Sequence, residues 1–194
     1  MKMWKFGLCT VLVLMLLAGC GEKQLSVSTD TLYIKRDGKV EEAAFELFDK
    51  EYYDAGELES FAEEEAREYN YKNVREAVKV DRVEVTDGVA AAYLSYESIN
   101  DYIDFNGAEI LAGTVKQAMN KEYDFDATFV SYDKWEPVDL LEVTKQIDNK
   151  IVILDASIDL RIDGTICYVS DNVQKKDKKN VTLTQGSLSY IIYK

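Results

Sequence analysis

The densest group of carboxylates in the chain lies between residues 49 and 59 and comprises Asp49, Glu51, Asp54, Glu57 and Glu59. Calcium takes about six to eight oxygen ligands, so an acidic loop between a strand and a helix is a chemically sensible site for it. The spacing differs from that of an EF-hand loop, and Asp54 with Glu57 has the spacing of a helix N-cap. We interpret the group first as capping and surface charge, and we keep Asp49, Glu51 and Asp54 as calcium candidates.

The absence of histidine from the sequence excludes several kinds of catalysis. Ser-His-Asp and Cys-His mechanisms and zinc sites built on imidazole all need that residue. The glycines Gly107 and Gly113 are isolated and lack the pattern of a phosphate-binding loop, so nucleotide chemistry is not expected. The alternative enzyme is a hydrolase that uses two carboxylates on cell-wall or other glycan, but no pair stands out. The sequence therefore favours a non-enzymatic protein, and no catalytic residue is assigned.

Tyrosines are the remaining side chains with binding chemistry. Tyr52 and Tyr53 adjoin the acidic group, and their amphipathic rings are candidates for contacts with a peptide or a glycan. Most of the 13 tyrosines are expected to be core or strand residues. Cys167 lies in the strand-like run 165–169, and without a histidine to activate it we interpret it as a buried, inert thiol.

The first twenty residues have the features of a bacterial lipoprotein signal peptide. Lys2 and Lys5 precede the apolar run 6–17, and the run ends in Leu17-Ala18-Gly19-Cys20, which resembles a lipobox. The resemblance implies cleavage between Gly19 and Cys20 and a diacylglyceryl thioether on Cys20, and two acyl chains anchor a protein stably. The uncharged stretch is shorter than the about 20 residues that a membrane-spanning helix needs.

This pattern predicts an extracytoplasmic protein, anchored to the cell membrane by lipid. We expect residues 1–19 to be the signal peptide, residues 20–30 the lipidated cysteine with a flexible tether, and residues 31–194 one domain. The net charge of −13 disfavours nucleic acid and direct docking onto anionic lipids. Expected partners are an envelope protein, a peptide or a glycan. No cofactor is expected apart from the calcium considered above.

Three Asp-Gly pairs predict β-hairpins, because this dipeptide supplies the positive φ angles of a tight turn. Asp37-Gly38 would join strands 31–35 and 39–48, and Asp87-Gly88 would join strands 78–85 and 89–96. The third pair, Asp163-Gly164, follows a run in which Ile158, Leu160 and Ile162 share one face. Further strands are expected at 128–132, 151–154, 181–184 and 188–193. The fold class is α+β, with an antiparallel sheet of hairpins packed against two main helices.

Capping signals locate those helices. Asp54 would cap the first main helix, which runs to about Tyr69, and Ser98 would open a short segment that ends at Phe105. The second main helix is expected from Gly107 to Lys121. Pro137 should lie in the first turn of a further short helix that contains Leu140, Leu141 and Val143.

Several segments of the mature region resemble a group of uncharacterised lipoproteins from Gram-positive anaerobes. They are residues 48–54 with Glu57-Leu58, Tyr102 with Phe105-Asn106-Gly107, Gly113-Thr114-Val115, residues 166–170 and residues 190–194. The resemblance implies the extracytoplasmic location and a shared fold, and it supplies no site residues.

Overall fold

The computed structural model describes residues 25–121 and 123–194. The predicted cleavage and lipidation positions, Gly19 and Cys20, lie outside these residues. Within them, the elements in chain order are β1 (Thr31–Ile34), β2 (Val40–Leu47), α1 (Ala55–Asn73), β3 (Val78–Thr86), β4 (Val89–Tyr96), α2 (Ile99–Asn106), β5 (Ile110–Thr114), α3 (Val115–Asn120), β6 (Phe129–Ser131), β7 (Pro137–Val138), α4 (Leu140–Thr144), β8 (Lys150–Leu154), β9 (Ile158–Ile162), β10 (Ile166–Ser170), β11 (Gln174–Lys175), β12 (Asn180–Leu183) and β13 (Ser189–Tyr193).

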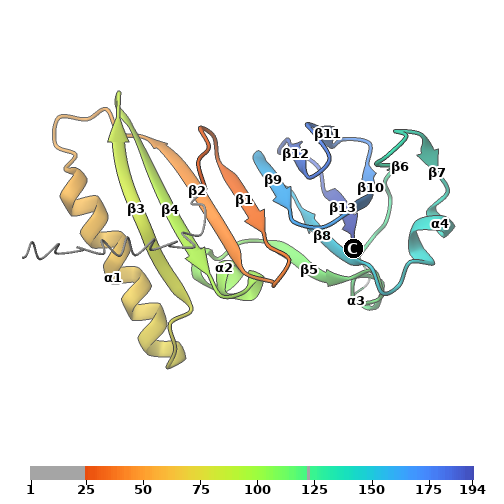
Figure 1. Cartoon of the computed structure of the whole chain (residues 1–194), viewed down its shortest axis with the longest axis horizontal. Coiled ribbons are helices and arrows are strands. Elements are labelled where there is room, and N and C mark those ends of the chain that lie inside the picture. Colours follow the sequence, from red (N-terminus) through yellow and green to blue (C-terminus); the bar gives the residue numbers. More distant parts are fainter. Residues whose placement is uncertain (1–24, 122) are drawn as a thin grey trace, which may run out of the picture.

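The strands form two sheets (Figure 1). The first has seven strands in the order β11-β12-β9-β1-β2-β4-β3, and the second has six in the order β5-β8-β13-β10-β6-β7. Neighbouring strands are antiparallel except β1 and β9, which pair in parallel. The α+β class is therefore confirmed, but the strands divide into two sheets and one pair is parallel, where a single antiparallel sheet was expected.

The main core joins the facing sides of both sheets. Leu32 and Leu160 of the seven-stranded sheet belong to the same buried cluster as Val152 and Ile191 of the six-stranded sheet. A second cluster lies on the other side of the six-stranded sheet, where α3 and α4 contribute Val115, Ala118 and Val143. Each sheet therefore buries side chains on both of its faces in at least part of its area.

The hairpins at the first two Asp-Gly pairs are present. Asp87 and Gly88 have φ angles of 51° and 76° and form a two-residue turn between the paired residues Thr86 and Val89. Gly38, at φ 93°, lies in the connection between β1 and β2. Both of these turns thus use the positive φ angles that the dipeptide favours.

The predicted hairpin at Asp163-Gly164 is wrong. This pair connects β9 in one sheet to β10 in the other, because β9 is already paired with β1 and β12, and β10 with β13 and β6. Glycine serves a different purpose here. A Cβ atom at Gly164 would lie 2.5 Å from the backbone oxygen of Lys194, so the close approach of the last residue requires a glycine.

The first main helix is confirmed, and it runs past Tyr69 to Asn73. Ser98 caps α2 as predicted. The helix expected from Gly107 to Lys121 is wrong: Gly107 ends α2 in a left-handed conformation, residues 110–114 form β5, and only residues 115–120 are helical. Pairing of β5 with β8 along five residues outweighs the local capping signal at Asn106.

The short helix with Leu140, Leu141 and Val143 is confirmed as α4. Pro137 does not lie in its first turn but in the two-residue strand β7, and Asp139 caps the helix through the backbone N–H of Leu141. The four further predicted strands are present as β6, β8, β12 and β13. In the described part of the chain, none of the helices combines the length and the apolar character needed to cross a membrane.

Candidate ligand-binding site

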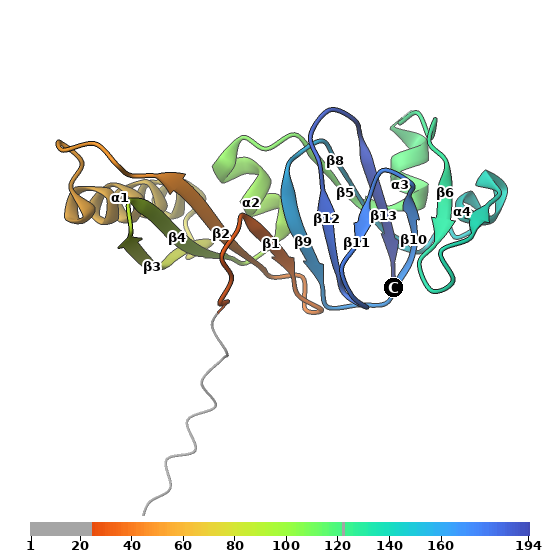
Figure 2. The same cartoon turned by 90° about the horizontal axis from the view of Figure 1, so that it is seen from above.

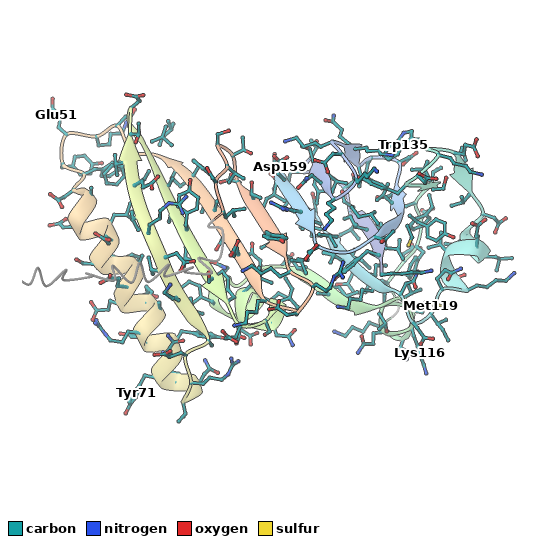
Figure 3. All side chains as sticks on the ribbon, in the orientation of Figure 1. Glu51, Tyr71, Lys116, Met119, Trp135 and Asp159 are labelled. Atoms are coloured by element: carbon teal, nitrogen blue, oxygen red, sulfur yellow. The ribbon has the colours of Figure 1, made fainter. Side chains whose placement is uncertain are left out.

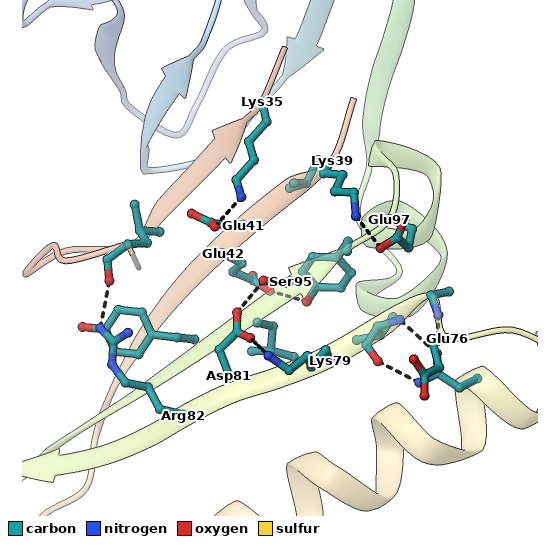
Figure 4. Close-up of a pocket in the computed structure, with 18 residues that line it drawn as sticks. Lys35, Lys39, Glu41, Glu42, Glu76, Lys79, Asp81, Arg82, Ser95 and Glu97 are labelled. Atoms are coloured by element: carbon teal, nitrogen blue, oxygen red, sulfur yellow. Dashed lines mark hydrogen bonds and ion pairs between the residues drawn. The ribbon is translucent and has the colours of Figure 1, made fainter. Parts of the chain in front are cut away.

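The seven-stranded sheet carries a pocket of about 620 Å³ on the face opposite the main core (Figure 4). We call it the outer pocket. Its walls come mainly from β2, β3 and β4, together with Lys35 after β1 and with Leu25. Pockets that hold small molecules have volumes of about 300–1,000 Å³, so the outer pocket is of sufficient size for one.

Strand register places four side chains in a line across this face. Tyr33 of β1 pairs with Glu41 of β2, Glu41 pairs with Ser95 of β4, and Ser95 pairs with Lys79 of β3. Because side chains alternate between the two faces of a sheet, these residues point to one side and their neighbours, such as Glu42 and Tyr96, to the other. The outer face of the sheet therefore carries a line of polar and aromatic side chains, whereas the other face of the sheet is apolar.

A β-bulge adds charged groups to this line. The register of β3 against β4 shifts between Val80 and Arg82, which leaves Asp81 as the extra residue. Bulges redirect side chains, and here Lys79, Asp81 and Arg82 all line the outer pocket. Asp81 accepts a hydrogen bond from Ser95 and forms an ion pair with Lys79 at 2.6 Å.

Arg82 closes one side of the pocket. Its guanidinium carbon lies 3.3 Å from the centre of the Tyr93 ring, and its Nη2 donates to the backbone oxygen of Leu25 at 2.8 Å. Its Nε pairs with Glu84 at 2.8 Å. The arrangement fixes the guanidinium in place, since stacking and hydrogen bonding both hold its plane.

Glu41 is the most unusual side chain of the outer pocket. Only 8% of the residue is exposed, and its Oε1 pairs with Lys35 Nζ at 2.7 Å. Its Oε2 is buried and has no hydrogen-bond partner among residues 25–121 and 123–194. A buried acceptor without a partner costs about 1–3 kcal/mol, so this oxygen is a position at which a donor from a ligand would stabilise the folded protein.

The segment 25–30 lies against the same face of the sheet. Leu25 is 7% exposed and packs with Ala43, Ala91 and Tyr93. Figure 2 shows this red segment on the side of β1 and β2 away from α2. The backbone N–H of Phe45 also donates to Asp30 at 2.7 Å. Residues 25–30 belong to the segment 20–30 that we expect to be a flexible tether, and that expectation stays a prediction. The contacts above place residues 25–30 against the sheet, and residues 20–24 lie outside the described residues.

The calcium candidates do not come together as a metal site. Asp49, Glu51 and Asp54 are exposed, and Glu51 lies at the loop before α1 (Figure 3). Asp49 pairs with Lys50 at 3.1 Å, and Asp54 caps α1 by accepting from the backbone N–H of Glu57 at 2.9 Å. In the described part of the chain, no three Asp, Glu, Cys or His side chains form a group suited to a metal. The structure thus assigns Asp54 the capping role.

Replacing Asp54 with alanine is expected to lower the free energy of unfolding by about 1 kcal/mol, because the first turn of α1 loses its N-cap. Chemical denaturation of the full chain measures the change. Asp54→Ser, which can still cap, should restore most of the loss. If Asp54→Ser is no more stable than Asp54→Ala, the Asp54 carboxylate has a role other than capping.

Tyr52 and Tyr53 lie in the connection between β2 and α1 and are 77% and 42% exposed. Their ring centres are 5.0 Å apart, and the ring of Tyr53 also contacts Phe48 at 4.7 Å. Neither residue lines the outer pocket. They form an exposed aromatic group at one end of the sheet, and their role in binding stays a prediction.

Cys167 is partly buried in β10, and its Sγ donates to the backbone oxygen of Thr165 at 3.4 Å. Burial raises the pKa of the thiol. A raised pKa lowers the fraction of reactive thiolate, which agrees with the interpretation of this residue as a structural thiol.

The carboxylate alternative was a pair of acids facing each other across a cleft. Burial raises the pKa of Glu42, and hydrogen bonds from Tyr96 and Asn106 to its carboxylate oppose this effect. Tyr96 donates to Glu42 Oε2 at 2.5 Å. Glu42 alternates with Glu41 along β2 and so points to the other face of the sheet. These two acids therefore do not face each other across the outer pocket.

No protein-family model, curated protein or solved structure matches the chain. The resemblance to uncharacterised lipoproteins stays a prediction.

Sequence reasoning did not find the outer pocket, although one signal pointed to its bulge. In β3 the apolar residues occupy positions 78 and 80 and then positions 83 and 85, so the alternation shifts by one residue at Asp81-Arg82. Such a shift is the sequence signature of an extra residue in a strand. Glu41, by contrast, carried no local signal.

Proposed function

We propose that this protein is an extracytoplasmic lipoprotein, held on the membrane by a lipid on Cys20, and that it acts as a non-enzymatic binding module. Its ligand occupies the outer pocket. Partners are an envelope protein, a peptide or a glycan, and neither nucleic acid nor nucleotide is among them.

The observation that carries this proposal is the position of Leu25. This residue lines the outer pocket, and its backbone oxygen accepts a hydrogen bond from Arg82. Leu25 is the fifth residue after Cys20, and five residues of extended chain span at most about 18 Å. A lipid on Cys20 would therefore hold the outer pocket close to the membrane surface.

Charge supports a location beside the membrane without direct contact with it. A chain with a net charge of −13 is repelled by anionic headgroups. A covalent lipid on a short segment overcomes this repulsion locally, whereas the body of the protein stays exposed to the envelope. This arrangement favours ligands of the inner envelope zone over the bilayer itself.

Mass spectrometry of the chain purified from the membrane fraction of the producing cell tests the anchor. We expect a polypeptide that begins at Cys20 with a diacylglyceryl group on that residue. Cys20→Ser should abolish the modification and the membrane association, whereas Cys9→Ser, in the predicted signal peptide, should preserve both. An intact leader with an unmodified Cys20 in the wild type would contradict the proposal.

A carboxylate hydrolase needs two carboxyl groups on opposite sides of a substrate, and no observation on the described residues favours such a pair.

A further inference from the structure

We infer that the outer pocket binds a neutral, polyhydroxylated ligand, a saccharide, and that a ligand hydroxyl donates a hydrogen bond to Oε2 of Glu41. This inference rests on the proposed binding function and names the chemical class of the ligand. Among the described residues that line the pocket, Glu41 alone has a buried side-chain polar atom without a hydrogen-bond partner.

A donor is required because of the state of Glu41. Its carboxylate is removed from water on a sheet face where the neighbouring groups are already engaged: Asp81 with Lys79 and Ser95, and Glu97 with Lys39 at 2.8 Å. Oε2 of Glu41 has no such contact within the described chain. A carboxylate oxygen can only accept, so the missing partner is an N–H or an O–H.

A neutral hydroxyl suits this position better than an ammonium group. Lys35 Nζ lies 2.7 Å from the other oxygen of Glu41 and already balances the charge of the carboxylate. Lys39, Lys79 and Arg82 line the same pocket. A second cation placed at Oε2 would be close to Lys35, and like charges at short distance repel strongly where water is excluded.

Several hydroxyls on one ligand fit the rest of the pocket. A hydroxyl donates one hydrogen bond and accepts others. Next to Glu41 in the line across the strands lies Ser95, whose hydroxyl donates to Asp81 and keeps lone pairs that can accept from a ligand. Strands in a sheet are spaced about 4.8 Å apart, which is close to the span between hydroxyls on opposite sides of a sugar ring. The acidic and basic groups of the pocket largely offset each other, so the ligand needs no net charge.

Isothermal titration calorimetry on the full chain, in a detergent that has no sugar headgroup, tests this inference. The probes are two neutral trisaccharides, cellotriose and N,N′,N″-triacetylchitotriose, and the dication cadaverine. We expect at least one trisaccharide to bind and cadaverine not to bind. Glu41→Gln should weaken the trisaccharide at least about tenfold, because hydrogen bonds to a charged acceptor are about twice as strong as neutral ones.

Matched variants keep the result interpretable. Glu46→Gln removes an exposed carboxylate of the same strand β2 that does not line the outer pocket, and it should leave the affinity unchanged. Ser95→Phe fills the pocket opposite Glu41 while keeping that carboxylate, and it should abolish binding. This second variant tests the site independently if Glu41→Gln does not fold.

Sedimentation with insoluble cellulose and chitin distinguishes the sources of the sugar. Retention on a polymer identifies a structural glycan, and binding of a soluble trimer without retention identifies free saccharides; both support the inference. Binding of neither trisaccharide, an unchanged affinity in Glu41→Gln and Ser95→Phe, or binding of cadaverine at this pocket would overturn it. Lipidated Cys20 with no saccharide binding would refute only the ligand class, whereas unmodified Cys20 would refute the proposed anchor.

Discussion

Replacing Ile191 with alanine is expected to lower the free energy of unfolding by about 2–5 kcal/mol. Ile191 lies in β13, where it is fully buried between the two sheets and pairs with Val152 of β8 and Val169 of β10. Both partners belong to the same buried cluster. Because strands on both sides hold the backbone in place, the structure cannot collapse into the space that the side chain leaves.

Urea denaturation of the full chain, followed by circular dichroism, measures this effect. Leu47→Ala is the matched control, since Leu47 is also an aliphatic strand residue but is largely exposed. Its effect should stay within about 0.5 kcal/mol. If the two variants lose similar stability, the two sheets do not share the core described above.

Replacing Asp101 with alanine is expected to cost about 2–3 kcal/mol. This carboxylate is 2% exposed at the start of α2 and joins that helix to the end of α1. It accepts from Arg75 Nη1 at 3.2 Å, from Ser98 Oγ at 2.7 Å and from Tyr69 Oη at 3.3 Å. Arg75 Nη2 also donates to Asp101 Oδ1. Alanine would remove all four acceptor contacts and leave their donors to find water at a partly buried site.

The effect of Asp101→Ala should depend on pH. Burial alone would raise the pKa of Asp101, but hydrogen bonds from Arg75 and Ser98 outweigh burial and hold the pKa below its ordinary value. A group whose pKa is lowered by folding stabilises the protein above the pKa of the unfolded chain, about 3.9. This stabilisation is lost as the pH falls through the lower pKa of the folded state.

The difference in unfolding free energy between wild type and Asp101→Ala should therefore be largest near pH 7 and should shrink below about pH 4. Denaturation curves at both pH values measure it. Asp104→Ala provides the control, because Asp104 lies on the same helix and is exposed. A difference that does not change with pH would mean that the ionised carboxylate contributes nothing to stability.

Local signals in the sequence were sufficient for elements whose ends are fixed by nearby residues. Asp54 and Ser98 cap their helices as expected, and the strand 89–96 has the bounds that were predicted. In each case, the deciding contact lies within a few residues along the chain. The Asp87-Gly88 turn belongs to the same class.

Where distant residues decide, the sequence-based prediction fails. Residues 110–114 carry no signal that β8 will pair with them, so local patterns predict a helix where the structure has β5. Asp163-Gly164 has the composition of a hairpin turn, but the edges of β9 and β10 are occupied by strands from elsewhere in the chain. Turn chemistry fixes a bend without fixing which strand lies beside it.

In the candidate site, too, local sequence signals and contacts between distant residues lead to different results. Asp49 and Glu51 are close together in sequence, which predicts a metal site, but neither residue lines the outer pocket. Glu41 gained its role from strand register, because pairing of β2 with β1 and β4 brings it between Tyr33 and Ser95. Only the shift of alternation at Asp81 could have been read from the sequence in advance.

The parallel pair β1–β9 has a consequence for biosynthesis. β1 ends at Ile34, and its parallel partner begins only at Ile158. At a ribosomal rate of about 5–20 residues per second, β1 waits on the order of ten seconds for that partner to emerge. During this interval one edge of a nascent sheet stays open to foreign strands. A holdase or rapid export would protect the nascent polypeptide until β9 has been translated.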